Sequence, residues 1–138
     1  MRIEVNTLNP AQFKRLYESV EWVSPDIRQI KIALGKSLAT FSVFVDDRLV
    51  GMARLLGDGA MSFYIRDLVI HPEYQGQDLG KQLVEYMEEY ILKQIEESWM
   101  VSLELICPKS NIGFYSKLGF EESSVALDSS MMLKMIRK

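Results

Sequence analysis

The chain is poor in the residues that build covalent cross-links and zinc sites. Cys107 is the only cysteine and His71 the only histidine, so an intramolecular disulfide and a four-ligand zinc site of these residues are excluded. A single cysteine agrees with a reducing compartment, and we expect a cytoplasmic protein. We interpret Cys107 as a small core residue and His71, which precedes Pro72 at a predicted strand end, as part of a surface turn.

Long apolar runs and an excess of basic residues are also missing. The longest apolar run is far shorter than the ~18 residues of a membrane span, and residues 1–6 alternate in polarity where a signal peptide would have an apolar core. The net charge of −3 argues against a broad nucleic-acid-binding face, which is usually basic. We therefore expect no membrane and no nucleic acid among the partners.

The remaining composition is that of a folded globular domain. The 138 residues are 48% hydrophobic and 25% charged, close to the average of soluble proteins. A chain of this length forms one domain and buries roughly two-thirds of its unfolded surface. We predict a single domain over residues 1–138.

Two helix-start signals follow a short predicted strand over residues 2–6. Asn9-Pro10 offers an N-cap and a proline at the first helical position, and Ser24-Pro25-Asp26 repeats the signal. Apolar residues recur at helical spacing after each signal, and the second helix is expected to end at Gly35. Two short helices separated by Trp22-Val23 are therefore predicted before the sheet.

Apolar runs separated by turn residues predict the remaining elements. Asp46-Asp47-Arg48 indicates a hairpin turn, so three consecutive antiparallel strands precede His71. From Leu79 the apolar residues follow the period of one long amphipathic helix, and Asn111 can cap a short helix that ends at Gly119. The expected strands are 41–45, 49–55, 61–70, 101–107 and two last strands, from Phe120 and from 131–136.

The segment from Leu68 to Val84 combines an apolar strand, a glycine-bearing turn and an amphipathic helix. The first N–H groups of a helix lack intrahelical partners and its N-terminus is partly positive, so such a turn can hold a phosphate. Two known phosphate loops fail on spacing. Gly76 and Gly80 have three residues between them where a P-loop has four, and Lys81 is not followed by a hydroxyl residue. A dinucleotide fingerprint would need glycine at position 78 and a third glycine in reach. We still expect a phosphorylated ligand.

The motif Gln75-x-x-Asp78-x-Gly80 resembles the Q/R-x-x-G-x-G/A loop of the GNAT (Gcn5-related N-acetyltransferase) superfamily, with aspartate where the family usually has glycine. Residues 47–54 and 64–72 resemble the family's second hairpin and central strand. Residues 113–120 resemble its F-Y-x-K-x-G-F helix and following strand. These motifs cover roughly residues 43–121 in the family's order. The resemblance implies an α/β (α+β) fold with a mixed, mostly antiparallel central sheet flanked by helices.

The resemblance also implies an acetyl-CoA-dependent N-acetyltransferase, with acetyl-CoA as cosubstrate and direct transfer to a primary amine of a small molecule or peptide. In the family, the loop holds the pyrophosphate and the preceding strand backbone binds the pantetheine arm and faces the thioester oxygen. Asn111 is closer to Tyr115 than the family's asparagine usually is, and capping explains it as well. The implied coenzyme A-binding residues are Leu68, Val69, Ile70, Gln75, Gly76, Gln77, Asp78, Leu79, Gly80, Lys81, Asn111 and Tyr115.

Acetyl transfer also needs a proton for the departing thiolate and a neutral amine. Tyr115 matches the tyrosine that protonates this thiolate in many family members, and the alternative is a packed aromatic residue. The general base is less evident. Asp67 and Glu104 lie on the central strand and its expected neighbour, where either accepts a proton directly or through water, or is simply solvated or paired. No metal is expected.

The acceptor amine is not identified by the sequence, because it depends on variable helices and loops. By resemblance, Trp22 and Val23 lie near the substrate, and Phe63 and Tyr64 are further candidates to line its site. A second hypothesis is a non-catalytic acyl-CoA-binding or regulatory module on the same fold, which Asp78 and the missing base keep open. The oligomeric state is open, with a homodimer as one alternative.

Asp78 is the one departure inside the loop. Its carboxylate is expected to cap the N–H groups of Gly80 or Lys81, which are donors that a pyrophosphate also needs. Cap and ligand then compete, while the backbone tolerates aspartate because Asp adopts left-handed conformations readily. The sequence thus predicts that Asp78→Gly tightens coenzyme A binding and slightly weakens the free protein.

Overall fold

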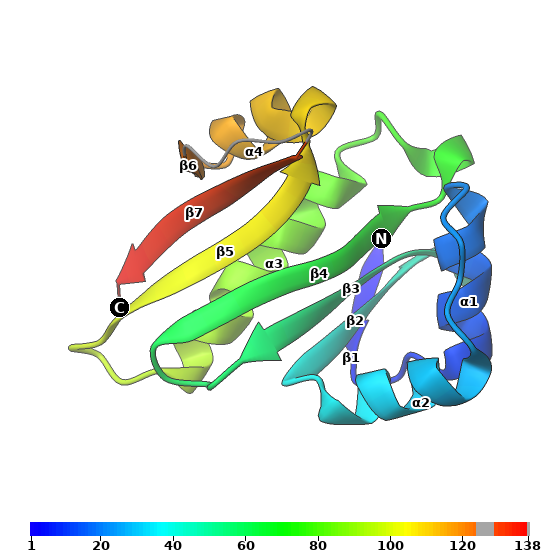
Figure 1. The fold of residues 1–138 in the computed structure, drawn as a ribbon, viewed down its shortest axis with the longest axis horizontal. Helices are drawn as coiled ribbons and strands as arrows, with labels where there is room; N and C mark the ends of the chain where they lie inside the picture. Colours follow the sequence, from blue (N-terminus) through cyan, green and yellow to red (C-terminus); the bar gives the residue numbers. More distant parts are fainter. Residues whose placement is uncertain (124–128, 138) are drawn as a thin grey trace.

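The computed structural model describes residues 1–123 and 129–137. These residues form a seven-stranded sheet in the order β1-β2-β3-β4-β5-β7-β6 (Figure 1). Neighbouring strands are antiparallel except for β4 and β5, which are parallel. The expected mixed, mostly antiparallel sheet with flanking helices is therefore confirmed. The strands are β1 (Arg2–Val5), β2 (Ala39–Val45), β3 (Arg48–Gly57), β4 (Ser62–Ile70), β5 (Met100–Pro108), β6 (Glu121–Ser123) and β7 (Ser129–Arg137).

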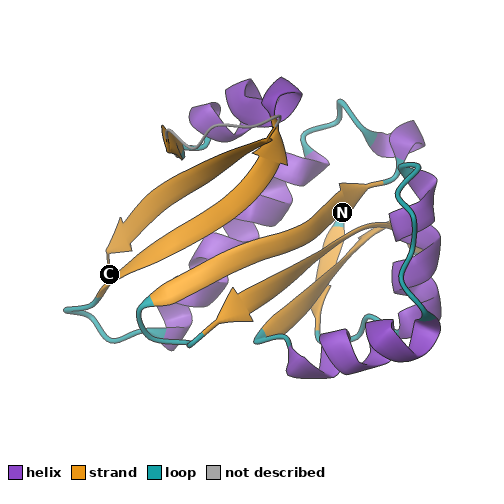
Figure 2. Ribbon diagram, viewed as in Figure 1, coloured by secondary structure: helices purple, strands orange, loops and turns teal. Residues whose placement is uncertain are grey.

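Helices pack on both faces of this sheet, with α3 on one face and α1 and α2 on the other (Figure 2). Met52 and Ala53 are neighbours on β3 but belong to different core clusters, because successive strand side chains point to opposite faces. Within the described residues, no helix is long and apolar enough to span a membrane. The helices are α1 (Pro10–Ser19), α2 (Ile27–Lys36), α3 (Leu79–Gln94), α4 (Ile112–Lys117) and the 3-10 turns η1 (Pro72–Tyr74) and η2 (Lys109–Asn111).

The local signals predicted from the sequence are confirmed at the first helices and the hairpin. Asn9 caps α1 in a reciprocal capping box with Gln12, and the Asp26 side chain accepts a hydrogen bond from a backbone N–H of α2. Asp46 and Asp47 have φ values of 46° and 60°, as a two-residue hairpin turn with positive φ at both positions requires. Short-range side-chain chemistry therefore sets these boundaries.

Several predicted boundaries differ from the observed ones by a residue or two, and contacts explain two of the differences. α2 continues through Gly35 to Lys36, because Ser37 closes the last turn by donating from its hydroxyl to the Ala33 carbonyl at 2.9 Å. The strand expected to include Phe120 begins one residue later, at Glu121. Phe120 is instead the buried last residue of a turn in which its N–H donates to the Tyr115 carbonyl at 3.1 Å.

The parallel strands β4 and β5 are paired along only part of their length. The register runs from Ser62 opposite Ser102 to Ile65 opposite Leu105 and does not continue beyond. Past that point the two strands separate toward their C-terminal ends (Figure 1). The sheet is therefore open at this end, between the loop that precedes α3 and the turn that precedes α4.

A β-bulge lies on β4 at the start of this opening. Asp67 and Leu68 together stand opposite a single β3 residue, Ala53, and neither has a register partner. Asp67 has a left-handed φ of 49°. The bulge interrupts the regular ladder and directs this part of the β4 backbone toward the opening.

Candidate active site

Two cavities meet where β4 and β5 separate. The larger cavity, of about 520 Å³, lies between the α1–α2 connection and the C-terminal halves of β4 and β5. The smaller cavity, of about 390 Å³, lies between the end of β4, residues 74–81 and α4. Leu68, Asn111 and Tyr115 line both. These three residues therefore mark the point at which the cavities adjoin.

The loop before α3 is built to leave helix donors uncovered. Gln75 ties the loop to the strand end, since its side-chain amide donates to the Ile70 carbonyl at 2.9 Å. Gly76 has a φ of 74°, a left-handed conformation that glycine adopts without steric cost. Across the described part of the chain, no acceptor contacts the N–H groups of Leu79 and Gly80. The start of α3 is thus available to an anion.

The expected cap by Asp78 is wrong. Asp78 occupies the N-cap position, but its side chain makes no capping hydrogen bond. A capping side chain normally extends from a backbone in the β region, whereas Asp78 is left-handed, with φ 59° and ψ 6°. The expected tolerance of aspartate for this backbone is confirmed. The carboxylate therefore does not occupy the helix donors.

Tyr115 brings a hydroxyl to the junction of the cavities. Tyr115 is only 7% exposed, and within the described ranges no group hydrogen-bonds to its hydroxyl. Burial, and secondly the neighbouring Cys107 thiol, raise the pKa of Tyr115 to about 12, so the phenol keeps its proton at neutral pH. Buried polar groups normally have partners, and an unpartnered one in a cavity wall suits a ligand.

Cys107 belongs both to the core and to the lining of the larger cavity. It is 2% exposed and belongs to the main core cluster, as the sequence interpretation expected, yet it also lines the larger cavity. Burial, and secondly the Glu122 carboxylate, raise the pKa of the Cys107 thiol. Since the thiolate is the nucleophilic form, the raised pKa makes Cys107 a poor nucleophile.

The bulge residue Asp67 also lines the larger cavity, but its carboxylate is occupied. It forms an ion pair with Arg54 of β3. Arg54 also reaches the end of α2, where its guanidinium lies 3.4 Å from the Ser37 hydroxyl and 3.5 Å from the Ala33 carbonyl. The pair therefore holds the bulge beside Leu68 in place.

Residues 37–122 match the model of the acetyltransferase (GNAT) domain family. The chain belongs to this family. An uncharacterized N-acetyltransferase ycf52 of Gracilaria tenuistipitata var. liui is 34% identical over 117 residues, which are 82% of this chain and 62% of that protein. The GNAT chain thus spans about three fifths of the length of this relative.

Solved structures share the fold. A probable acetyltransferase from meticillin-resistant Staphylococcus aureus has a TM-score of 0.77 at 27% identity, over 89% of this chain and 92% of that one. An aminoglycoside 6′-N-acetyltransferase complexed with coenzyme A has a TM-score of 0.79, over 100% and 99% of the two chains. At 16% identity, the second likeness concerns the fold alone.

Most residues predicted for the cofactor line the smaller cavity of the GNAT domain. Asn111 stands at the N-cap position of α4 without a side-chain cap, so the capping explanation from the sequence is wrong and its place at both cavities is the notable feature. Val69 is buried against α1 and α2 instead, and Gln77 lies outside both linings. The predicted residues that line the smaller cavity are Leu68, Ile70, Gln75, Gly76, Asp78, Leu79, Gly80, Lys81, Asn111 and Tyr115.

Of the residues predicted for the acceptor and the base, some line the larger cavity and others line neither cavity. Trp22 and Val23 line the larger cavity, as Asp67 does. Glu104 lines neither cavity, and its carboxylate accepts a hydrogen bond from Ser102 at 3.0 Å. Phe63 is buried in the core on the α3 face, and Tyr64 is also absent from both linings.

Sequence reasoning missed several cavity residues, and three of them are charged or aromatic residues of the larger cavity. Tyr17 and Glu21 line the larger cavity from the α1–α2 region, and Arg66 lines it from β4. Because Tyr17 is one of the apolar residues at helical spacing, the sequence indicated only a packing role for it. It lies five residues before Trp22, which is little more than one helical turn. Arg66 adjoins the bulge, and nothing in the sequence marked that bulge.

Proposed function

We propose that this GNAT domain is an acetyl-CoA-dependent N-acetyltransferase that transfers the acetyl group directly to a primary amine. The observation that carries the proposal is the meeting of the two cavities at Leu68, Asn111 and Tyr115. The smaller cavity would take the pyrophosphate and pantetheine, and the larger one the amine. Direct transfer needs both substrates to meet at one point, and the shared lining residues provide it.

The residues of the smaller cavity fit coenzyme A. The N–H groups of Leu79 and Gly80 have no described protein acceptor and suit the pyrophosphate at a helix N-terminus. Lys81 adds a positive charge, since its only ion pair within the described ranges is a loose contact of 3.8 Å with Glu85. The aminoglycoside acetyltransferase of the same fold was crystallised with coenzyme A, which supports the assignment.

Acetyl-CoA supplies an activated thioester, and the residues of the chain would do the rest. Leu68 lines both cavities, and a backbone N–H of this bulge would lower the energy of a developing oxyanion at the thioester. Tyr115 would hold a proton for the departing thiolate, and its pKa of about 12 keeps that proton in place at neutral pH. Burial would also raise the pKa of the coenzyme A thiol beside Tyr115. The difference between the pKa of the tyrosine and that of the thiol then becomes smaller, which favours proton transfer.

The base stays a proposal. Of the two predicted carboxylates, Asp67 is the one that lines the acceptor cavity, and its ion pair with Arg54 makes a water held at its free oxygen the better proton carrier than the carboxylate itself. Glu104 would have to act through a longer relay, because it lines neither cavity. The cytoplasmic location and a homodimer also stay predictions.

Two measurements test the proposal. Calorimetry should show coenzyme A binding at micromolar to millimolar concentration, and thiol release from acetyl-CoA should depend on an added amine, with the acetylated product identified by mass spectrometry. A panel of amino acids, peptides, arylalkylamines, polyamines and aminoglycosides covers the main acceptor classes. Binding without amine-dependent thiol release would support the non-catalytic alternative, and absence of binding would refute both.

A further inference from the structure

The larger cavity contains an unpaired cation. Its charged lining residues are Glu21, Arg66 and Asp67. The charge of Asp67 is balanced by Arg54. Arg66 is exposed, and it forms no ion pair with any residue in the ranges 1–123 and 129–137. Arg66 thus lines the cavity without a carboxylate partner among the described residues.

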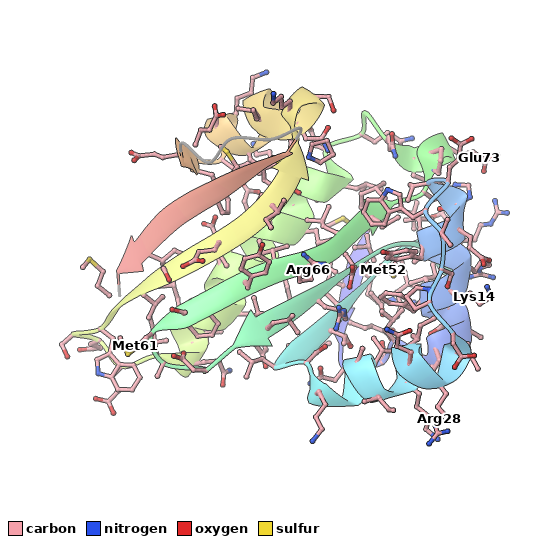
Figure 3. All side chains as sticks on the ribbon, in the orientation of Figure 1. Lys14, Arg28, Met52, Met61, Arg66 and Glu73 are labelled. Carbon is pink, nitrogen blue, oxygen red and sulfur yellow. The ribbon has the colours of Figure 1, made fainter. Side chains whose placement is uncertain are left out.

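Arg66 lies on β4 above the exposed face of the sheet (Figure 3). Its guanidinium carbon is 5.9 Å from the centre of the Tyr64 ring, which is a cation–π distance. Glu104 is the register partner of Tyr64 on β5, but its carboxylate accepts from Ser102 and makes no ion pair with Arg66. The N–H donors of a guanidinium match the two oxygens of a carboxylate.

The opposite wall of the cavity is apolar and exposed. The rings of Tyr17 and Trp22 are in edge contact with centres 4.9 Å apart, Trp22 is 41% exposed and Val23 is 94% exposed. Apolar side chains beside a cavity are the surface that a bound apolar group covers. Arg66 and these apolar residues therefore line the same cavity.

The geometry points to an acceptor that carries a carboxylate and a large apolar group next to its primary amine, which is the chemistry of an aromatic or large aliphatic α-amino acid. Arg66 binds the carboxylate, and the wall of Tyr17, Trp22 and Val23 covers the side chain. This substrate class rests on the proposed acetyltransferase function. Polyamines and aminoglycosides carry several ammonium groups, whereas Glu21 is the single unpaired carboxylate among the cavity residues that the structure describes.

Matched acceptor pairs test the inference. L-Tryptophan is compared with tryptamine, and L-phenylalanine with phenethylamine, with kcat/KM corrected for the fraction of neutral amine. The amino acids should exceed their decarboxylated partners by roughly tenfold or more, as expected for a charge-assisted hydrogen bond. Equal or better turnover of the partners, or of spermidine and kanamycin, would overturn the inference.

Substitutions then assign the preference to one residue. Arg66→Ala should remove the advantage of the amino acids, Arg66→Glu should reverse it, and Arg66→Lys should keep part of it. Arg28→Glu is the matched control, because Arg28 is an exposed residue of α2 that points away from the sheet (Figure 3). If Arg66→Glu behaves like Arg28→Glu, Arg66 does not read the carboxylate.

A binding measurement tests the substrate class separately from the acetyltransferase function. With coenzyme A present, calorimetry should show tighter binding of N-acetyl-L-tryptophan than of N-acetyltryptamine, and Arg66→Glu should abolish the difference. This readout does not need turnover. Thiol release that never depends on an amine refutes the proposed function, whereas acetylation of all amines without regard to a carboxylate refutes only the substrate class.

Discussion

The side chains of Arg54 on β3 and Asp67 on β4 form an ion pair at the bulge. Their side chains are 14% and 8% exposed, less than either partner of any other ion pair within the described residues. Through its contacts with Ser37 and Ala33, Arg54 joins the bulge to the last turn of α2. α2 thereby holds the bulge backbone at the point where the two cavities adjoin.

Arg54→Ala should destabilise the fold strongly. Removal of one partner leaves the buried carboxylate of Asp67 unpaired, which costs about 3 to 5 kcal/mol. Urea unfolding measures the loss. Lys14→Ala is the control, because Lys14, which lies on α1 (Figure 3), forms an exposed pair with Glu18, worth at most about 1 kcal/mol. Equal effects of the two substitutions would contradict a structural role for the buried pair.

Asp58 should make stability depend on acid pH. Its carboxylate accepts hydrogen bonds from the N–H groups of Ser62, Ala60 and Met61, which lower its pKa from 3.8 to about 2. Because the folded pKa is the lower one, the stabilisation is present above pH 3.8 and is lost as the pH falls toward 2.

Asp58→Asn tests this dependence. The variant should melt at a lower temperature at neutral pH, and the difference from the unsubstituted protein should shrink between pH 4 and 2. Glu97→Gln, at an exposed position, removes a carboxylate without disturbing this turn. A melting-temperature difference for Asp58→Asn that stays constant down to pH 2 would disprove the role of the ionised carboxylate.

Tyr115→Phe should lower kcat about 10²-fold or more and leave KM for acetyl-CoA nearly unchanged. The substitution removes a proton donor but keeps the ring contacts with Phe114 and Phe120. Steady-state kinetics on an identified acceptor provide the measurement. Tyr86→Phe on α3, whose ring contacts Phe41 in the core, is the control. Full turnover of Tyr115→Phe would leave Tyr115 a packing residue.

The features predicted from sequence depend on short stretches of chain. The capping residues Asn9 and Asp26 and the Asp46-Asp47 turn act on backbone groups a few positions away, so their effect is visible locally. The loop before α3 and Tyr115 were predicted from motif spacing. The structure places both beside the same cavity.

The bulge on β4 could not be predicted, and it changes which face of the sheet the following side chains cover. Strand alternation alone would place residue 69 on the same face as Phe63 and Ile65. The extra residue shifts the pattern, so that Val69 packs with α1 and α2 while Ile70 returns to the α3 face. Asp67, which pairs with Arg54, lies in the bulge, whereas Arg66 precedes it, in regular register with Arg54.

Asp78 offers the sharpest test of the coenzyme A site. Since its carboxylate caps no helix donor, its effect on the ligand is charge repulsion, on the order of 1 to 4 kcal/mol for a charge pair roughly 4 Å apart. Asp78→Asn keeps the tolerance for a left-handed backbone and removes the charge. Asp78→Gly removes the charge and relieves a backbone cost of about 1 kcal/mol. Both variants should bind coenzyme A roughly tenfold more tightly. Because Asp78 caps no helix donor, the weakening of free Asp78→Gly expected from sequence is replaced by a gain in stability, which Asp78→Asn should lack.

Calorimetry at low and at high salt, combined with urea unfolding, distinguishes the effect of the Asp78 charge on affinity from the effect of the backbone conformation on stability. The gain in affinity should shrink as salt rises, because exposed charges are screened, while the added stability of Asp78→Gly should not. Glu97→Gln supplies the same charge change away from the loop. Weaker coenzyme A binding by Asp78→Asn at low salt would show that the carboxylate points away from the pyrophosphate and organises the loop, because repulsion of the ligand predicts the opposite change.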